Sequence, residues 1–372
     1  MRIGIDYTAA VRQQAGIGRY TRELIKALFE RDDSHHYTLF AATGGIKRET
    51  LALKLGANAR LRTIPLSDEW VARLWHRARL PLPVEAITGR QDLFYSPDFV
   101  LPPTLPNTRA LLTVHDLSFV HYPDHFVPKL VHYLNQVVPR SVRRADRVLA
   151  DSEATRSDLL QWLGTPPQKV QVIYGGVDAR FQPQPAAGER ERLQARYGIK
   201  EPPYILAVGT IQPRKNYGGL MRAFARLGSP NLQLVIAGRP GWLYKETLAE
   251  AEKQPRVQVL GFVPDDDLPA LYRQATLFVF PSFYEGFGLP VLEAMACGTP
   301  VVCSRASSLP EVAGDAALLI DPHSPAEMAQ AMHQAIGDSS LRRQMVARGR
   351  EQAARFTWQR AASQLLAAFH DC

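Results

Sequence analysis

The sequence predicts an α/β fold of two Rossmann-like domains that face each other across a cleft. A length of 372 residues suggests two or three domains. In both halves, short apolar runs alternate with helical patterns, which is typical of parallel sheets with helical crossovers. A stretch rich in proline separates the halves. We therefore expect a first domain over residues 1–178, a linker over residues 179–203 and a second domain over residues 204–355.

Apolar runs of strand length mark the expected sheets. In the first half they are Arg2–Ile5, Tyr37–Ala41, Leu93–Tyr95, Ala110–Val114, Arg147–Ala150 and Val170–Ile173. In the second half they are Tyr204–Val208, Gln233–Ala237, Val257–Leu260, Leu277–Phe280, Val301–Cys303 and Ala317–Ile320. Doubly wound sheets bind ligands beyond the carboxyl ends of their strands, so we expect the chemistry on loops that follow strands.

Prolines and a glycine mark the linker, at Phe181-Gln-Pro-Gln-Pro-Ala-Ala-Gly188 and at Glu201-Pro202-Pro203. A charged helical stretch lies between these two segments. The chain ends in a helical pattern over residues 356–372. Its apolar face is formed by Trp358, Ala361, Leu365, Leu366 and Phe369.

Composition and charge limit the class of protein. The net charge is +8, and residues 1–180 contribute +6 of it. A basic first half suits a phosphate-bearing partner or an anionic membrane surface, and a mildly basic soluble surface explains it equally well. Three cysteines without metal-type spacing indicate a reducing, cytoplasmic compartment. No apolar run has the length of a membrane-spanning helix, and no nucleic-acid-binding motif is present.

The segment from Glu285 to Glu293 carries the strongest functional pattern. It follows an apolar strand, contains Gly286 and Gly288, and continues into a helical pattern from Leu289. Glycines let backbone N–H groups approach a ligand, and a helix start offers free N–H groups to a diphosphate. Glu293, about one turn into the helix, could accept hydrogen bonds from a ribose, and Glu285 could face a sugar. Alternatively, Glu293 complements the helix dipole and Glu285 is a solvated turn residue.

This segment resembles the signature of a known family. Glu285-x7-Glu293 followed by Ala294-Met-Ala-Cys-Gly298-Thr-Pro300-Val is similar to the motif of the retaining glycosyltransferases of family 4, which have the GT-B fold. The resemblance covers nearly the whole chain, and the subtype resembles bacterial mannosyltransferases of surface-polysaccharide synthesis. It implies a donor site that includes Phe287, and a terminal helix that crosses back to the first domain.

Two adjacent cations, Arg214 and Lys215, follow another strand and precede a helix. Cations at a helix start oppose the helix dipole, which favours an anion as their partner over a solvated pair. A guanidinium and an ammonium suit a departing diphosphate, whose charge we expect them to neutralise at a place apart from Glu285. Many family members have Gly-Arg where this chain has Gly209-Thr210, so Arg214 is the candidate substitute for that arginine.

Other segments gain a role through the resemblance. Gly16-Ile-Gly18 resembles the family's N-terminal glycine loop, which lies over the donor diphosphate or near the acceptor, although packing at a helix start explains it equally well. Gly209 lies in the loop expected to hold the donor. Phe262 and Val263 resemble the strip whose backbone contacts the nucleotide base.

His115 follows a strand and is the candidate contact to the donor sugar, with Asp116 to orient it; a structural histidine is the plain alternative. His121, His125 and His132 do not have a compact metal-binding spacing. The resemblance implies protein cations and helix termini at the leaving group, so we expect no metal and no cofactor.

Residues 68–80 combine tryptophans, leucines and arginines. They could lie at a membrane interface or line a lipid-phosphate acceptor site, giving peripheral association with the inner face of the membrane. A surface helix with an aromatic stripe toward the core is the simpler explanation.

Together these features predict a retaining glycosyltransferase that moves a hexose from a nucleotide-sugar donor to a glycan or lipid-linked acceptor. The resemblance of Gly209-Thr-Ile-Gln-Pro-Arg-Lys-Asn216 to mannosyltransferases favours GDP-mannose as the donor. The alternatives are a UDP-sugar-dependent transferase of the same fold, a sugar-nucleotide epimerase and a non-catalytic basic binding protein.

Overall fold

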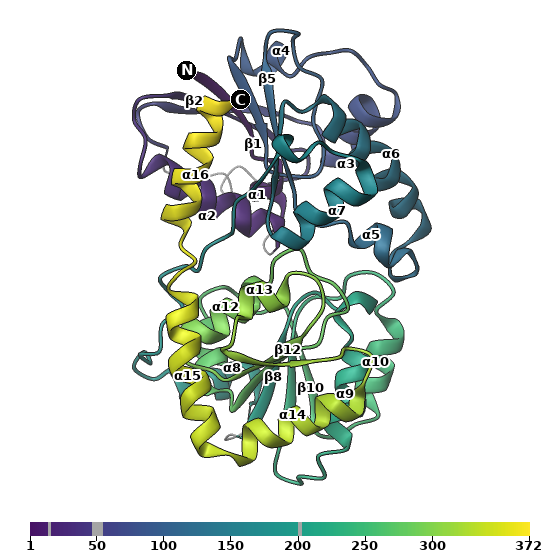
Figure 1. Cartoon of the computed structure of the whole chain (residues 1–372), viewed down its shortest axis with the longest axis vertical. Helices are drawn as coiled ribbons and strands as arrows, with labels where there is room; N and C mark the ends of the chain where they lie inside the picture. The colour runs from purple at the N-terminus through teal and green to yellow at the C-terminus, as the bar shows by residue number, and fades with distance from the viewer. Residues whose placement is uncertain (14–15, 47–54, 200–202) are drawn as a thin grey trace. The chain divides into compact units, whose positions relative to one another are not determined.

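The structure is a computed structural model that describes residues 1–13, 16–46, 55–199 and 203–372 (Figure 1). Contacts divide the chain into two compact units. The first consists of Met1–Leu117, His132–Gly176 and Trp358–Cys372, and the second consists of Ser118–Val131 and Val177–Thr357. Of the predicted linker, Lys200, Glu201 and Pro202 lie outside the described residues.

The first unit contains a seven-stranded parallel sheet in the order β3-β2-β1-β4-β5-β6-β7. Its strands are β1 (Arg2–Asp6), β2 (His36–Ala42), β3 (Ala59–Ile64), β4 (Leu93–Ser96), β5 (Arg109–Val114), β6 (Arg147–Ala150) and β7 (Val170–Val172). Its helical segments are α1 (Thr8–Arg12), α2 (Ile17–Phe29), α3 (Asp68–Val71), the π-helix η2 (Ala72–Arg77), α4 (Glu85–Thr88), most of α6 (Pro128–Arg144), α7 (Glu153–Leu163), η4 (Pro167–Lys169) and α16 (Trp358–Asp371).

The second unit contains a six-stranded parallel sheet in the order β10-β9-β8-β11-β12-β13. Its strands are β8 (Tyr204–Val208), β9 (Gln233–Ala237), β10 (Val257–Gly261), β11 (Leu277–Phe280), β12 (Val301–Ser304) and β13 (Ala317–Ile320). Its helical segments are α5 (Ser118–His121), η3 (Pro123–His125), α8 (Glu189–Tyr197), η5 (Pro213–Lys215), α9 (Tyr217–Ala225), α10 (Lys245–Glu252), α11 (Leu268–Gln274), α12 (Leu289–Ala296), α13 (Leu309–Ala313), α14 (Pro325–Gly337) and α15 (Ser339–Ala353).

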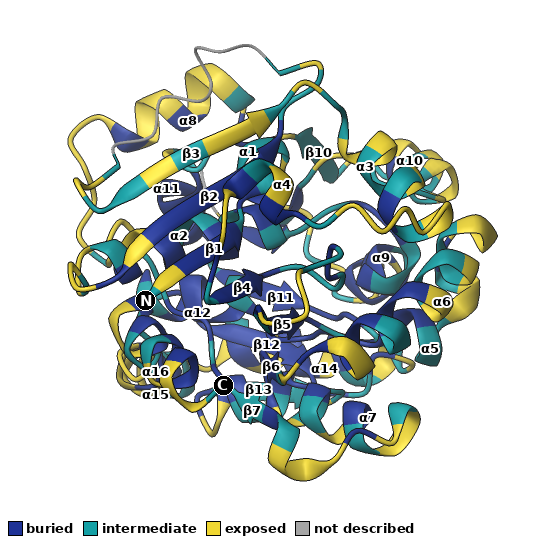
Figure 2. Ribbon diagram, turned by 90° about the horizontal axis from the view of Figure 1, so that it is seen from above, coloured by how far each residue is buried: buried dark blue, intermediate teal, exposed yellow. Residues whose placement is uncertain are grey.

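The predicted strands are confirmed because parallel strands covered on both faces are continuous apolar runs. β11, with the sequence Leu-Phe-Val-Phe, is buried at every position. β3 was not predicted. It is an edge strand on which Arg60, Arg62 and Thr63 are exposed, so its sequence lacks the apolar run (Figure 2).

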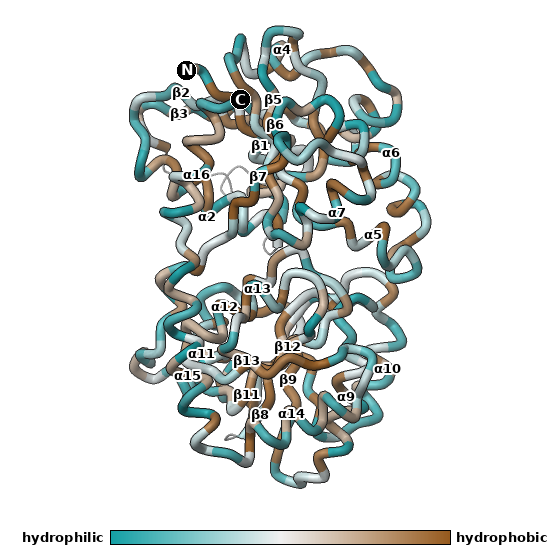
Figure 3. The backbone as a smooth tube through the Cα atoms, in the orientation of Figure 1, coloured by the Kyte–Doolittle hydropathy of each residue, from teal (hydrophilic) through white to brown (hydrophobic). Residues whose placement is uncertain are grey.

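Helices cover the sheets with their apolar faces. In the second unit, side chains of α9 and α14 pack on β8, β9 and β11 in one core cluster, and Figure 3 shows hydrophobic residues concentrated along the strands. In the first unit, α16 packs beside α2 (Figure 1). α14 begins with a side-chain N-cap, in which the Ser324 hydroxyl accepts from Glu327 N and Pro325 occupies the first turn.

The predicted linker contains the expected helix. Residues 189–197 form α8, and its buried Glu189 pairs with Arg273 of α11 at 2.5 Å.

Among the described residues, no helix combines the length and apolarity needed to span a membrane.

Candidate functional site

The order of the second sheet creates a natural place for a ligand. β8 and β11 are neighbours, although they are far apart in the chain, and the strand order runs in opposite directions from this pair. In doubly wound sheets such a switch point opens a crevice beyond the carboxyl ends of the two strands. The loop after β8 carries Arg214 and Lys215, and the loop after β11 carries Glu285. The topology therefore brings these three predicted site residues to the same end of the same two strands.

Arg214, Lys215 and Glu285 form one buried cluster. Lys215 Nζ donates to Glu285 Oε1 at 2.6 Å, and Arg214 lies 2.8 Å from Glu285 Oε2. Lys215 and Glu285 are only 8% and 7% exposed. The sequence had suggested that the two cations act apart from Glu285, whereas the structure joins all three.

The cluster retains one net positive charge, from two cations and one carboxylate. Burial alone would raise the pKa of Glu285, but Arg214 and Lys215 lower it to about 2, so the carboxyl is ionised at neutral pH. Lys215 Nζ also lies 4.7 Å from the centre of the Phe280 ring, within cation–π range. A positively charged group of this kind, buried at a switch point, can bind an anionic part of a ligand.

Serine side chains fix the loop that follows β11. The Ser307 hydroxyl accepts from Glu285 N at 2.8 Å. The Ser308 hydroxyl lies 2.9 Å from Glu285 O and 2.6 Å from Phe287 O. Gly288 has a φ of 119°, and a Cβ there would approach Leu309 to 2.8 Å. The loop from Glu285 to Gly288 is therefore held against the start of α13, and it leads into α12 at Leu289.

Glu293 lies on α12 and is 2% exposed. Its Oε2 accepts a hydrogen bond of 2.9 Å from the hydroxyl of Tyr272 on α11. The start of α12 agrees with the sequence, since Pro290 lies in the first turn. Gly298, just beyond the end of the helix, has a φ of 78°. The ribose-binding role of Glu293 stays a prediction, and Tyr272 is a neighbour that no spacing in the sequence indicated.

Backbone crowding explains the glycine after β8. A Cβ on Gly209 would lie 3.2 Å from the Tyr217 hydroxyl and 3.3 Å from Lys215 Cε, and the φ of 147° is one that favours glycine. The same loop passes so close to the loop after β9 that a Cβ on Gly238 would overlap Gly209 O. These two glycines let the loops after β8 and β9 pack together beside the cluster.

The predicted base-contacting strip follows β10. Val263 is buried, whereas the Phe262 ring is 38% exposed and has the Arg239 guanidinium 3.9 Å from its centre. Arg239 lies in the loop that follows β9. Its stacking on Phe262 gives this part of the second unit a flat cation–π surface next to the strand ends.

In the first unit, His115 is held by two acceptors. Its Nδ1 lies 2.6 Å from Asp151 Oδ2 and its Nε2 lies 2.8 Å from Pro97 O. The expectation that Asp116 orients this ring was wrong. Val114 and Ala150 are paired in the parallel register of β5 and β6, so the residues that follow them, His115 and Asp151, are neighbours.

Both partners of the His115 ring accept hydrogen bonds, so both ring nitrogens carry hydrogen and the side chain is an imidazolium. Burial would lower its pKa, but Asp151 and nearby acceptors raise it to about 9 from the ordinary value of 6.5. A sugar hydroxyl can reach a ring nitrogen only by replacing one of these two contacts. The donor-sugar role of His115 therefore stays a prediction.

We expect His115 to stay protonated well above neutral pH. Because its pKa in the folded protein is raised, the stabilisation is fully present below pH 6.5 and is lost as the pH rises through about 9. ¹⁵N NMR of the imidazole, assigned with His115→Gln, should show loss of the proton near pH 9. Asp151→Asn should move this titration to lower pH. A wild-type titration near pH 6.5 would contradict the assignment.

The two glycines of the glycine loop in the first unit, Gly16 and Gly18, have different surroundings. Gly16 precedes α2 with a φ of 59°, and a Cβ there would meet no atom of the described residues within 4 Å. A Cβ on Gly18 would lie 2.1 Å from Gln13 O and 2.6 Å from Ala9 O. Packing of α2 against the preceding segment therefore explains Gly18, whereas Gly16 owes its place to its positive φ.

Of the three histidines that follow His115, His121 and His125 border one aromatic cluster, in which the Tyr284 and Tyr122 rings lie 6.4 Å apart. His121 stacks on Tyr284 at 4.9 Å, and His125 stacks on Tyr122 at 5.1 Å. His132 contacts Gln136 on the same helix. Within the described part of the chain, no group of three or more His, Cys, Asp or Glu side chains is arranged to hold a metal ion.

The tryptophan- and arginine-rich stretch is not one continuous surface helix. It forms α3 and then the π-helix η2. Trp75 packs in a core cluster with Phe40, Val84 and Phe94. Trp70 is 52% exposed and has the Arg73 guanidinium 4.8 Å from its ring centre. One tryptophan therefore belongs to the core, as the simpler explanation held, and the other lies on the surface.

Family comparisons cover both units. Residues 15–181 match the family model described as Glycosyltransferase Family 4, and residues 189–352 match the one described as Glycosyl transferases group 1. O-antigen chain mannosyltransferase B of Escherichia coli is 34% identical over 370 residues, which cover 95% of this chain and 95% of that protein. D-inositol 3-phosphate glycosyltransferase of Salinispora arenicola is 38% identical over 60% of this chain and 54% of that protein. Serotype-specific mannosyltransferase WbdA of Escherichia coli is 35% identical over 58% of this chain and 27% of that protein.

Solved structures share the fold. Sucrose-phosphate synthase from Thermosynechococcus elongatus superposes with a TM-score of 0.80 at 22% identity, covering 100% of this chain and 98% of that one. Anabaena HepE in complex with UDP-glucose superposes with a TM-score of 0.76 at 20% identity, covering 100% of both chains. At such identities the likeness concerns the two-domain architecture alone.

Proposed function

Since this chain belongs to glycosyltransferase family 4, the glycosyl transferases group 1, and has its GT-B fold, we propose that it transfers mannose from GDP-mannose to a glycan or lipid-linked acceptor. The reaction class is that of the family. The choice of mannose is supported by a relative that matches this chain over 95% of both lengths, the O-antigen chain mannosyltransferase B of Escherichia coli. The observation that carries the proposal is the cluster of Arg214, Lys215 and Glu285 at the switch point.

We assign the donor to the carboxyl end of the second sheet. The diphosphate would approach Arg214, Lys215 and the first N–H groups of α12, which lie at the ends of adjoining loops. It would share the two cations with the Glu285 carboxylate, which also accepts hydrogen bonds from sugar hydroxyls. Glu293 would give up the hydrogen bond that it accepts from Tyr272 and accept hydrogen bonds from the ribose hydroxyls instead. Gly209, Gly286, Phe287 and Val263 would contribute backbone contacts.

We further propose that transfer proceeds with retention and without a covalent enzyme intermediate. The bond between the anomeric carbon and the β-phosphate oxygen breaks while the acceptor oxygen bonds to that carbon from the same face. The acceptor proton passes to the departing phosphate oxygen, which releases GDP. Arg214 and Lys215 neutralise the charge that develops on this oxygen. Because protein cations have this role, we propose that neither a metal ion nor another cofactor takes part.

We place the enzyme in the cytoplasm, at the inner face of the membrane. The net charge of +6 on residues 1–180 supports attraction to anionic lipid headgroups, and a lipid-linked acceptor would be presented there.

Turnover of a panel of GDP- and UDP-sugars tests the donor. We expect release of free mannose and GDP from GDP-mannose in the absence of acceptor, unchanged by EDTA, and slower turnover of UDP-glucose. NMR of freshly formed product should show the α anomer first, as retention requires for an α-linked donor. Preference for a UDP-sugar would overturn the donor assignment, and an epimerised sugar nucleotide would overturn transfer itself.

A further inference from the structure

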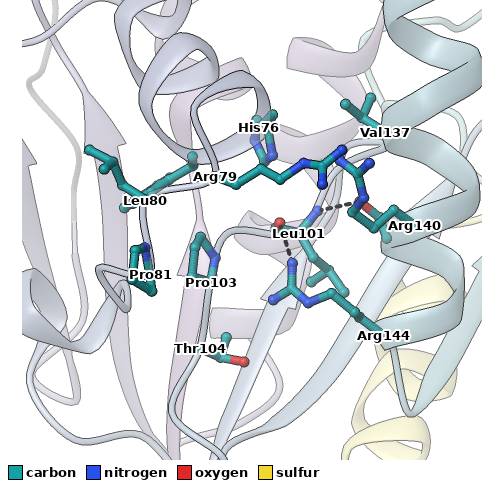
Figure 4. Close-up of a pocket in the computed structure, with 12 residues that line it drawn as sticks. His76, Arg79, Leu80, Pro81, Leu101, Pro103, Thr104, Val137, Arg140 and Arg144 are labelled. Atoms are coloured by element: carbon teal, nitrogen blue, oxygen red, sulfur yellow. Dashed lines mark hydrogen bonds between the residues drawn. The ribbon is translucent and has the colours of Figure 1, made fainter.

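A pocket of about 310 Å³ lies on the first unit between the segment after α3 and the later part of α6 (Figure 4). The cation–π contact of Arg77 with Tyr133, 5.5 Å from the ring centre, joins these two elements at its side. Thr104 and Arg144, which line the pocket, lie a few residues before β5 and β6 begin, whereas His115 follows the end of β5. The pocket is therefore on the amino-end side of these strands and shares no residue with the candidate donor site.

The polar wall of this pocket is strongly basic. Arg79, Arg140, Arg144 and His76 line it, and none of the described lining residues is Asp or Glu. Figure 4 shows the side chains of Arg79 and Arg140 extending toward one another. Arg144 is fixed by the backbone, since it donates to Leu101 O at 3.1 Å and to Pro102 O at 2.7 Å.

The arginines influence the titratable groups beside them. Burial, with Arg144 and Arg140, lowers the pKa of His76 to about 4, so this ring is neutral and can still donate a hydrogen bond. Burial and Arg140 also lower the pKa of Arg144. Like charges held together without a carboxylate repel one another, and a bound anion would relieve this repulsion.

The backbone at the pocket is also unusual. Arg79 has a φ of 55°, a left-handed conformation that is uncommon for a residue with a side chain. Arg79 lies two residues beyond the end of the π-helix η2. π-Helices are rare overall, and those that occur are often found at functional sites. The strained backbone presents the Arg79 side chain to the pocket at an energetic cost, which a binding role would explain.

The remaining wall is mostly apolar, and Thr104 and Ser141 are its polar members. Its apolar residues are the buried Trp75, Leu101 and Val137 together with Leu80, Pro81 and Pro103. Leu80 is 43% exposed, so an apolar surface continues from the pocket to the outside. We propose that this pocket binds a phosphate or diphosphate group attached to an apolar body. The guanidinium groups bind the anion, His76 donates to it, and the apolar wall contacts the attached body.

Such a ligand comes from one of two sources, the headgroup of an anionic lipid or a soluble phosphorylated compound. Isothermal titration of the full chain with dihexanoyl phosphatidic acid tests the shared chemistry, and dihexanoyl phosphatidylcholine is the matched probe without net charge. The test variant is Arg79→Gln/Arg140→Gln. The control variant, Arg90→Gln/Arg143→Gln, removes two exposed arginines of the same unit that do not line the pocket.

We expect the test variant to bind the phosphatidic acid about tenfold or more weakly than the wild type, as expected for the loss of charged hydrogen bonds, and the control variant to bind like the wild type. Arg79→Lys/Arg140→Lys should recover part of the affinity. Unchanged thermal unfolding will show that each variant is folded. Equal binding by the wild type and the test variant, or no binding by the wild type, overturns the proposal.

Co-sedimentation with vesicles of dioleoylphosphatidylcholine, with and without dioleoylphosphatidic acid, separates the two sources. Binding that requires phosphatidic acid and is lost in the test variant identifies a lipid headgroup as the ligand. Binding of the soluble probe, with vesicle binding equal in all variants, identifies a soluble phosphorylated compound. Neither readout involves glycosyl transfer, so the inference stands or falls independently of the donor.

Discussion

Lys215→Ala should reduce kcat by about 10²–10³-fold, the usual effect of removing one preorganised group that stabilises developing charge. Lys215 Nζ lies 2.6 Å from Glu285 Oε1. Its removal leaves one of the two cations of this cluster to balance both the buried carboxylate and the departing phosphate. The effect should fall on kcat more than on KM, because the phosphate charge grows in the transition state.

The measurement is steady-state release of GDP from GDP-mannose by the wild type and the variant. Lys245→Ala, which removes an exposed lysine from α10 of the same unit, is the matched control and should leave kcat unchanged. Wild-type kcat in Lys215→Ala, with an unchanged fold, would refute the role of this lysine in the leaving-group step.

Glu285→Gln has the second large expected effect, a loss of about 3 kcal/mol of folding free energy at neutral pH together with most of the activity. The substitution keeps the shape of the side chain but removes the negative charge that pairs with the buried Arg214 and Lys215, and breaking a buried ion pair in this way is strongly destabilising. The magnitude agrees with the pKa: a carboxyl that titrates at about 2, compared with its ordinary value of 4.5, stabilises the folded state by about 3 kcal/mol.

The loss of stability in Glu285→Gln should depend on pH, as expected for a carboxylate that is ionised in the folded protein. Because the pKa of Glu285 is lowered in the folded protein, its contribution is present above pH 4.5 and is lost as the pH falls toward 2. Thermal unfolding of the wild type and Glu285→Gln should therefore differ most near neutral pH and converge in acid. A difference in stability that is independent of pH would argue against an ionised, paired carboxylate.

The sequence predicted those parts of the fold that depend on continuous apolar runs. β8, β9 and β11 could be recognised because both faces of each strand are covered. β3 could not, because an edge strand with exposed Arg60 and Arg62 has no apolar pattern to recognise. The missed strand therefore reflects the physical difference between a central and an edge strand.

The candidate site was predictable where it depended on a motif and unpredictable where it depended on register. Glu285 and the two cations could be identified from their loops, but their direct pairing follows from the neighbouring positions of β8 and β11. Likewise, the partner of His115 is set by the pairing of β5 with β6, which places Asp151 beside it. Contacts between residues far apart in the chain arise from sheet order, which no local pattern contains.

Asn216 has a consequence for the engineering of donor specificity. Its φ is 56°, and its side-chain amide donates to Pro281 O at 3.2 Å and to Pro322 O at 2.7 Å. One side chain thus ties the loop after β8 to the first residues beyond β11 and near the end of β13. Loops at this edge are therefore not interchangeable parts. A chimaera that receives residues 209–216 from a relative must retain the asparagine, or receive all three loops together.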